Sequence, residues 1–141
     1  MTASPTTTQE APVPAGEIFT ADQRHEIDKA IREANRVSGR DFSVRVASSE
    51  EDSRRTAEQL HAALPRPGNS ILIYVDPVAR SLEIVTGADV RHTLSNRQAA
   101  LAAITMQSAF ATGDLDRGIR SGLAQLARLA TPVTSLHTNT P

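Results

Sequence analysis

The chain has 141 residues, a formal net charge of −1 and no cysteine. A charge this close to zero creates no field that recruits nucleic acid or anionic lipid, and aromatic residues, at 3% of the chain, are too few to stack single strands. The lack of cysteine excludes disulfides, thiolate metal sites and cysteine nucleophiles.

Both ends of the chain have the composition of tails. Residues 1–17 and 131–141 show no apolar period and cannot bury enough apolar surface to offset their ordering entropy. We therefore predict disordered tails around one domain at residues 18–130, which is long enough for a single layered core. Because no apolar leader and no run of membrane-spanning length is visible, we expect a cytoplasmic protein without a membrane span.

The first predicted helix and strand lie in FTADQRHEIDKAIREANRVSGRDFSVRVA. Thr20 is a good N-cap, Gln23 stands at the capping-box position, and an apolar stripe runs along the helix to a left-handed stop at Gly39. Residues 42–46 then alternate between apolar and polar side chains, which predicts a half-buried strand.

A second helix and a central strand follow. The stretch SSEEDSRRTAEQLHAALPRPG predicts a helix that is capped by Ser48 or Ser49 and ended by Pro65 and Pro67. The chain is then continuously apolar over residues 71–75, a pattern typical of a strand that is covered on both faces. A strand, a helix and a strand in this order imply a parallel pair with a right-handed crossover.

The third predicted strand, SLEIVTG, returns after a turn. Pro77 fixes φ at the second turn position, and the side chain of Asp76 can accept hydrogen bonds from the turn amides. So short a connection makes the third strand antiparallel to the central one. We therefore predict an α/β fold in which a small mixed sheet of three to four strands, centred on residues 71–75, is sandwiched between helices (α/β/α).

Two helices complete the predicted fold. The first is capped by Ser95 and is apolar almost all round, so we expect it to be buried. It stops at Gly113, and the stretch DLDRGIRSGLAQLARLA predicts the second helix. Asp114 is its predicted N-cap, and Asp116 lies in its first turn, where a carboxylate favours the positive end of the helix.

The familiar catalytic and metal motifs are missing from the sequence. It has no P-loop, dinucleotide-binding or nucleophile-elbow pattern, and its four histidines are scattered, so we expect no zinc site. Asp114 and Asp116 suggest a calcium loop, but Gly118 comes one place too early for an EF-hand and the twelfth loop residue is Gln125. Capping alone explains both aspartates; the alternative is that they also hold a cation or a polar ligand.

Two other acidic positions each have two interpretations. Asp76 lies just beyond the central strand, at the edge where open α/β sheets bind ligands, or it only forms the turn before Pro77. Asp89 and His92 are three residues apart after the third strand, and they form either a solvated turn or a polar site.

The stretch NSILIYVDPVARSLEIVTG, followed by FATGDLDRGIRSGLAQLA, resembles the TPM-type domain, the family of thylakoid-lumen acid phosphatase-like proteins and their bacterial relatives. It is most similar to an actinobacterial branch described only as a domain of unknown function, and the resemblance covers Phe19 to Leu129. The resemblance implies an α/β/α sandwich. Some relatives are acid phosphatases, some bind divalent cations through an acidic cleft, and others are assembly or accessory proteins.

The resemblance implies a candidate metal site at Asp76, Asp89 and Asp114, with Ca²⁺ or Mg²⁺ as the candidate ion. The chain departs from the family where relatives often carry acidic residues: residues 67–70 read Pro-Gly-Asn-Ser, and Ser-Asn at 95–96 ends a stretch that tends to read Leu-Pro-Asp in relatives. Since Ca²⁺ takes about six to eight oxygen ligands, several of them charged, these departures predict a weak or missing site.

Two functions follow from these observations. The first is a small non-catalytic module that binds a protein partner or another ligand. The alternative is a divalent-cation-dependent, acid phosphatase-like hydrolase, weak or vestigial, with Asp76 and Asp114 as ligands and with Arg80, Arg91 and Arg97 as candidate phosphate holders. No nucleophile–base pair is visible, so we favour the first function and expect a monomer with no catalytic residue and no nucleic-acid partner.

Overall fold

The computed structural model describes residues 18–132. The predicted tail at residues 1–17, and all but the first two residues of the tail at 131–141, lie outside the described residues. None of the helices within the described range is long and apolar enough to cross a membrane.

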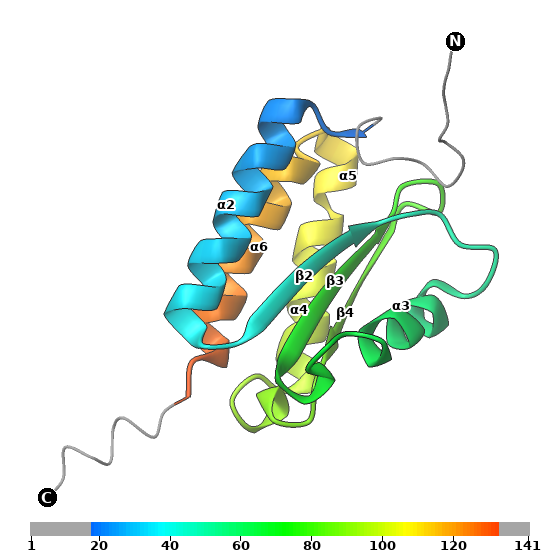
Figure 1. Cartoon of the computed structure of the whole chain (residues 1–141). Coiled ribbons are helices and arrows are strands. Elements are labelled where there is room, and N and C mark those ends of the chain that lie inside the picture. Colours follow the sequence, from blue (N-terminus) through cyan, green and yellow to red (C-terminus); the bar gives the residue numbers. More distant parts are fainter. Residues whose placement is uncertain (1–17, 133–141) are drawn as a thin grey trace, which may run out of the picture.

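Three strands form one sheet in the order β2-β3-β4 (Figure 1). The central strand β3 (Ser70–Asp76) is parallel to β2 (Asp41–Val46) and antiparallel to β4 (Ser81–Thr86). The prediction of a small mixed sheet with residues 71–75 at its centre is confirmed.

Helices cover both faces of this sheet (Figure 1). Three of them, α2 (Ala21–Ser38), α4 (Asn96–Gln107) and α6 (Leu115–Ala130), lie on one face, and α3 (Ser53–Ala62) lies on the other. α2 packs on β2 and α6, α4 packs on β4 and α6, and α3 packs on β3 and β4. The predicted α/β/α fold class is therefore confirmed.

Three short helical turns join the longer elements: η2 (Pro67–Asn69), η3 (Val90–His92) and α5 (Ala109–Thr112). The sequence pattern predicts one helix up to Gly113, but α4 ends at Gln107 and α5 is a separate turn.

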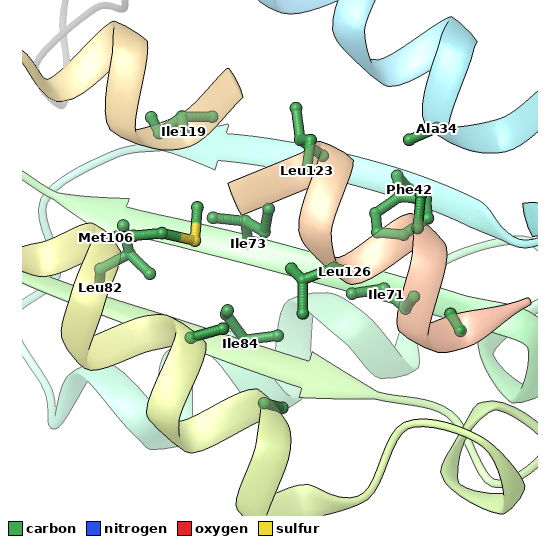
Figure 2. Packing of buried hydrophobic residues seen from close by; sticks show 14 of the residues in the cluster. Ala34, Phe42, Ile71, Ile73, Leu82, Ile84, Met106, Ile119, Leu123 and Leu126 are labelled. Atoms are coloured by element: carbon green, nitrogen blue, oxygen red, sulfur yellow. The ribbon is translucent and has the colours of Figure 1, made fainter. Parts of the chain in front are cut away.

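All seven residues of β3 are buried, which explains its continuous apolar run. Alternate side chains face the two helical layers. Ile71 and Ile73 belong to the larger core beneath α2, α4 and α6 (Figure 2), whereas Leu72 and Tyr74 lie in the smaller core beneath α3. Burying a side chain of this size contributes roughly 1.5–3 kcal/mol, so this one strand stabilises both layers.

The predicted helix caps are partly confirmed. Thr20 and Gln23 form a capping box at the start of α2, and Gly39 ends the helix at φ 75°. The predicted cap of α3 is wrong, because its N-cap is Asp52 and not Ser48 or Ser49. Ser49 lies in the loop that leads into α3, and its hydroxyl instead bonds to the hydroxyl of Thr56 within α3 at 2.6 Å.

The prediction that α4 is buried all round is wrong. Ala99, Ala102 and Met106 are buried on one side of the helix, but Leu101 and Ile104 are 57% and 67% exposed. The composition is apolar on every side of α4, yet only the side that meets β4 and α6 is covered by other described elements.

Gly87 lies directly against the backbone of η2, at the end of β4. A Cβ added to Gly87 would be 2.0 Å from the carbonyl oxygen of Pro67 and 2.3 Å from that of Gly68. The Gly87 N–H donates to the carbonyl of Ser70 at 2.9 Å, so the backbone cannot move away without losing this bond. The close approach holds the end of β4 against the turn that leads into β3.

We predict that Gly87→Ala lowers the free energy of unfolding by about 2 kcal/mol or more, because a backbone carbonyl cannot make room as a side chain can. Gly113→Ala is the matched control. Gly113 has φ 78° and nothing within 4 Å of an added Cβ, so only backbone strain of about 1–2 kcal/mol is expected there. Urea unfolding of both variants measures the difference, and an equal or smaller loss for Gly87→Ala would contradict the contact.

Candidate functional site

Asp76 lies at the carboxyl end of β3 and is 1% exposed. Its Oδ1 accepts hydrogen bonds from the N–H groups of Val78 and Ala79, both at 3.0 Å, as the turn prediction requires. Its Oδ2 accepts a third bond from the N–H of Ser49 at 3.2 Å. The carboxylate therefore joins the loop after β2 to the turn between β3 and β4, and both of its oxygens are engaged by the backbone.

Tyr74 closes the same end of the parallel pair. The N–H of Ala47 donates to the carbonyl of Val75. In a regular parallel ladder, the carbonyl of Ala47 would then accept a hydrogen bond from the N–H of residue 77. That residue is Pro77, which has no N–H, and the hydroxyl of Tyr74 donates to Ala47 instead at 2.8 Å. Burial raises the pKa of the Tyr74 hydroxyl, and the negative charge of Asp76 raises it further.

Asp89 lies at the opposite end of the sheet. Its N–H donates to the carbonyl of Gly68, which precedes β3, whereas Asp76 ends that strand. At about 3.3 Å per residue, the two aspartates are about 20 Å apart along the strand direction. The antiparallel return of β4 causes this separation, because it carries the chain back to the end at which β3 begins.

Asp114 occupies the N-cap position of α6, as predicted, but it does not cap the helix with its side chain. Its side chain makes no capping hydrogen bond, and the residue is exposed. Asp116 in the first turn instead pairs with Arg120 at 3.1 Å. Gly113 ends the preceding turn at φ 78°, as expected.

The three candidate ligands, Asp76, Asp89 and Asp114, do not form one cluster. Within residues 18–132 no group of three or more His, Asp or Glu side chains is arranged to hold a metal ion. Binding of a cation by one of these aspartates alone stays a prediction.

The arginines that could hold phosphate are also separated. Arg80 lies in the turn between β3 and β4, 5.4 Å from the ring centre of Phe110. Arg91 lies in η3, beyond the other end of β4, and Arg97 lies on α4. Arg91 lines a cleft of about 550 Å³ with Arg54, but Glu58 lines the cleft too and pairs with Arg54 at 3.2 Å.

Sequence reasoning missed the role of Arg40, which is 9% exposed. Its guanidinium donates to the carbonyl of Ala130 at the end of α6, to Asn69 and to Thr93. A positive charge is favourable at a helix C-terminus, so Arg40 joins the end of α6 to the start of β3. No pattern in the sequence predicts this, because the three partners are far apart along the chain.

The two edges of the sheet differ in how their backbone groups are bonded. On β4, Gln107 accepts from the N–H of Leu82 at 3.3 Å and Arg54 donates to the carbonyl of Ile84 at 2.8 Å. Arg91 also donates to the carbonyl of Thr86. Side chains thus bond one outward backbone group of each of these three residues of β4, which partly protects its free edge.

On β2 the free edge is open over most of its length. The backbone groups of successive residues in a strand point alternately to its two sides. Ala47 bonds towards β3, so the N–H and C=O groups of Phe42, Val44 and Val46 point away from the sheet. Asn35 accepts from the N–H of Phe42 at 2.8 Å. Among residues 18–132, no hydrogen bond reaches the outward groups of Val44 or Val46.

A hollow of about 160 Å³ lies beside this edge, between β2 and α2. Arg24 and Asp28 are its charged lining residues. The other lining side chains are apolar: Phe19, Ile27, Ile31, Val44 and Val46. The open edge and the hollow are neighbours on one side of the molecule, and the sequence could not reveal this, because nothing in DFSVRV says which strand is an edge.

The chain matches a family model described as a domain of unknown function (DUF5130) over residues 3–127. It is also 27% identical over 101 residues to the uncharacterized proteins Rv2468c and MT2543 from two strains of Mycobacterium tuberculosis. The match covers 72% of this chain, which spans 60% of the length of these relatives.

Three solved structures share the fold. The NMR structure of the BA42 protein from the psychrophilic bacterium Bizionia argentinensis gives a TM-score of 0.73 at 21% identity, covering 83% of this chain and 84% of that one. The N-terminal domain of the cg2496 protein from Corynebacterium glutamicum gives 0.67 at 15% identity, covering 89% and 88%. The N-terminal domain of a P. gingivalis protein gives 0.65 at 17% identity, covering 82% and 78%.

We predict that Asp76→Asn lowers the free energy of unfolding by about 1–3 kcal/mol, because the amide nitrogen cannot accept a hydrogen bond and at least one buried N–H loses its partner. Asp89→Asn is the control. Asp89 is exposed, so its substitution should change the free energy by less than about 0.5 kcal/mol. Urea unfolding compares the variants, and equal stabilities would show that the Asp76 bonds do not stabilise the fold.

We predict that the stabilising effect of Tyr74, the single tyrosine, is lost at alkaline pH. The pKa of Tyr74 is raised above 10.0, so above that pH the folded state keeps a proton that the unfolded state releases. The free energy of unfolding of the wild type should therefore fall, relative to Tyr74→Phe, as the pH rises through 10. At pH 8 the wild type should be more stable by about 1 kcal/mol, and a gap that stays constant up to pH 11 would refute the shift.

Proposed function

The chain belongs to the DUF5130 family of domains of unknown function, and on that premise we propose that it is a non-catalytic module that binds a protein partner. One observation carries the proposal: the edge of β2 at Val44 and Val46 is open and lies beside a mostly apolar hollow, whereas side chains bond three residues along the edge of β4. Unpaired strand edges are templates for pairing with other chains, and proteins normally block them. An edge left open next to apolar side chains has the features of a binding surface.

The buried carboxylate of Asp76 weighs against the alternative, a cation-dependent phosphatase-like hydrolase. Such an enzyme needs a nucleophile or a metal-activated water, together with charge that holds the phosphate. Both oxygens of Asp76 already accept hydrogen bonds from backbone N–H groups, and Asp89 is at the far end of the sheet. Cation binding at Asp76 would have to displace at least one of those bonds.

The binding module is the domain itself. We propose a TPM-type domain at residues 18–130 that works as a monomer in the cytoplasm, flanked by two tails. The boundaries are supported by the larger core, which includes both Phe19 and Ala130. The TPM-type assignment is supported by the α/β/α sandwich and by the aspartate turn after the central strand.

The alternative is tested by phosphate release from p-nitrophenyl phosphate in the presence of about 1 mM Ca²⁺ or Mg²⁺. We expect the wild type to release no more phosphate than Asp76→Asn and Asp114→Asn, each assayed well below its melting temperature. Asp114 is exposed, so this second ligand variant should keep the fold. Release by the wild type that both variants lose would overturn the non-catalytic proposal.

A second readout is thermal unfolding with and without the same ions. A site with an affinity of about 10 μM would add roughly 2.7 kcal/mol at about 1 mM ion. We expect no shift of the melting temperature, and a shift that Asp76→Asn abolishes would again favour the cation-dependent alternative.

A further inference from the structure

We propose that β2 binds an extended segment of a partner protein as an additional antiparallel strand, and that this segment carries an acidic residue between two apolar residues. The inference rests on the proposed function and specifies its ligand. The inference is wrong if such segments do not bind at β2. The proposed function is wrong if the protein is a catalyst, so the two failures are distinguishable.

The hydrogen-bonding groups come from two residues of β2. The N–H and C=O groups of Val44 and Val46 point away from the sheet, and an antiparallel strand would exchange two hydrogen bonds with each residue. Phe42 offers at most its C=O group, because Asn35 already holds its N–H at 2.8 Å. The available edge therefore selects a short segment of about three residues paired with residues 44–46.

The hollow between β2 and α2 selects apolar side chains. Val44 and Val46 line it together with Ile27 and Ile31 of α2. Directly opposed residues of two antiparallel strands place their side chains on the same face of the sheet. The partner residues opposite Val44 and Val46 would therefore direct their side chains towards the hollow, where apolar groups lose the most contact with water.

Arg45 favours an acidic side chain at the partner residue that lies between those opposite Val44 and Val46. Its side chain lies on the other face of β2 and is exposed, and it forms no ion pair within residues 18–132. In the proposed ladder Arg45 occupies a non-hydrogen-bonded pair, where opposed side chains are closest. An Asp or Glu opposite Arg45 would form a cross-strand charge pair, and a basic residue would be repelled.

A second copy of this chain fits the edge poorly. Pairing β2 with itself around Arg45 places two arginines opposite each other, which is destabilising. Pairing centred on Val44 requires the N–H of Phe42, which Asn35 holds. Neither of these two registers provides both a full ladder and compatible charges.

The chain's own ends also lack the required pattern. Residues 1–17 contain Pro5, Pro12 and Pro14, which have no N–H to donate to a ladder, and neither glutamate in them lies between two large apolar residues. Residues 133–141 contain no acidic residue. Neither end supplies the apolar–acidic–apolar pattern, so a segment of another protein fits the edge better than either of them.

The probe is a fluorescein-labelled peptide with blocked ends, Ser-Thr-Val-Glu-Val-Thr-Ser, titrated with the full chain up to about 1 mM and followed by fluorescence anisotropy. Three further peptides are compared: one with Lys in place of Glu, one with both valines N-methylated, and one with the sequence of residues 2–16. Sedimentation velocity reports the oligomeric state, and the melting temperature of each variant reports its fold.

We expect the Glu peptide to bind about fivefold more tightly than the Lys peptide. Arg45→Glu should reverse this preference, and because Arg45 is exposed the variant should keep the fold. N-methylation and Val44→Pro should each weaken binding at least about tenfold, since both block the ladder. Arg97→Glu, on the distant helix α4, is the matched control and should leave both affinities unchanged.

Several results would overturn the inference. One is the absence of binding by the Glu peptide. Another is a charge preference that Arg45→Glu leaves in place, or binding that N-methylation does not weaken. If the chain sediments as a dimer that Val44→Pro dissociates, the occupant is a second copy. If the peptide of residues 2–16 binds more tightly than the Glu peptide, the occupant is the chain's own N-terminal segment.

Discussion

Complete burial of β3 is the constraint on which the rest of the structure depends. Every residue of Ser70–Asp76 is buried, so both faces must be covered by helices and both edges must be paired with strands. This requirement accounts for α3 on one face, for the larger core on the other, and for β2 and β4 on either side. It also makes the two ends of β3 critical. Gly87 allows the backbones to meet closely at one end, and Asp76 holds two loops together at the other.

The buried carboxylate of Asp76 has a structural role that its hydrogen bonds define. Removing an ionised group from water is costly unless hydrogen bonds replace the lost hydration. Three backbone N–H groups provide that replacement, and they come from segments on both sides of β3. Together with the Tyr74 bond to Ala47, they complete the end of a parallel ladder that Pro77 interrupts. These structural hydrogen bonds lie at the carboxyl edge of the sheet, where many α/β proteins bind ligands.

The sequence predicts most of the fold, because its signals there are local. Thr20 and Gln23 mark the start of a helix, Gly39 marks its end, and the apolar run at residues 71–75 marks a fully buried strand. The site is less predictable, because it depends on topology. The apolar composition of α4 cannot show which side meets other elements, so the sequence does not reveal that Ile104 is exposed. The predicted sheet of three to four strands likewise places β2 beside the central strand but cannot show whether a further strand covers its other edge.

The hydrogen bond from Phe42 to Asn35 has a kinetic consequence. By occupying the N–H of Phe42, Asn35 leaves Val44 and Val46 as the only residues of β2 whose two outward groups are both free within residues 18–132. A strand held by so short a ladder has few bonds to break before it leaves, and differences in affinity between related complexes arise mostly in the dissociation rate. Segments paired with β2 would therefore exchange rapidly, and the duration of any complex would depend on contacts made elsewhere on the partner.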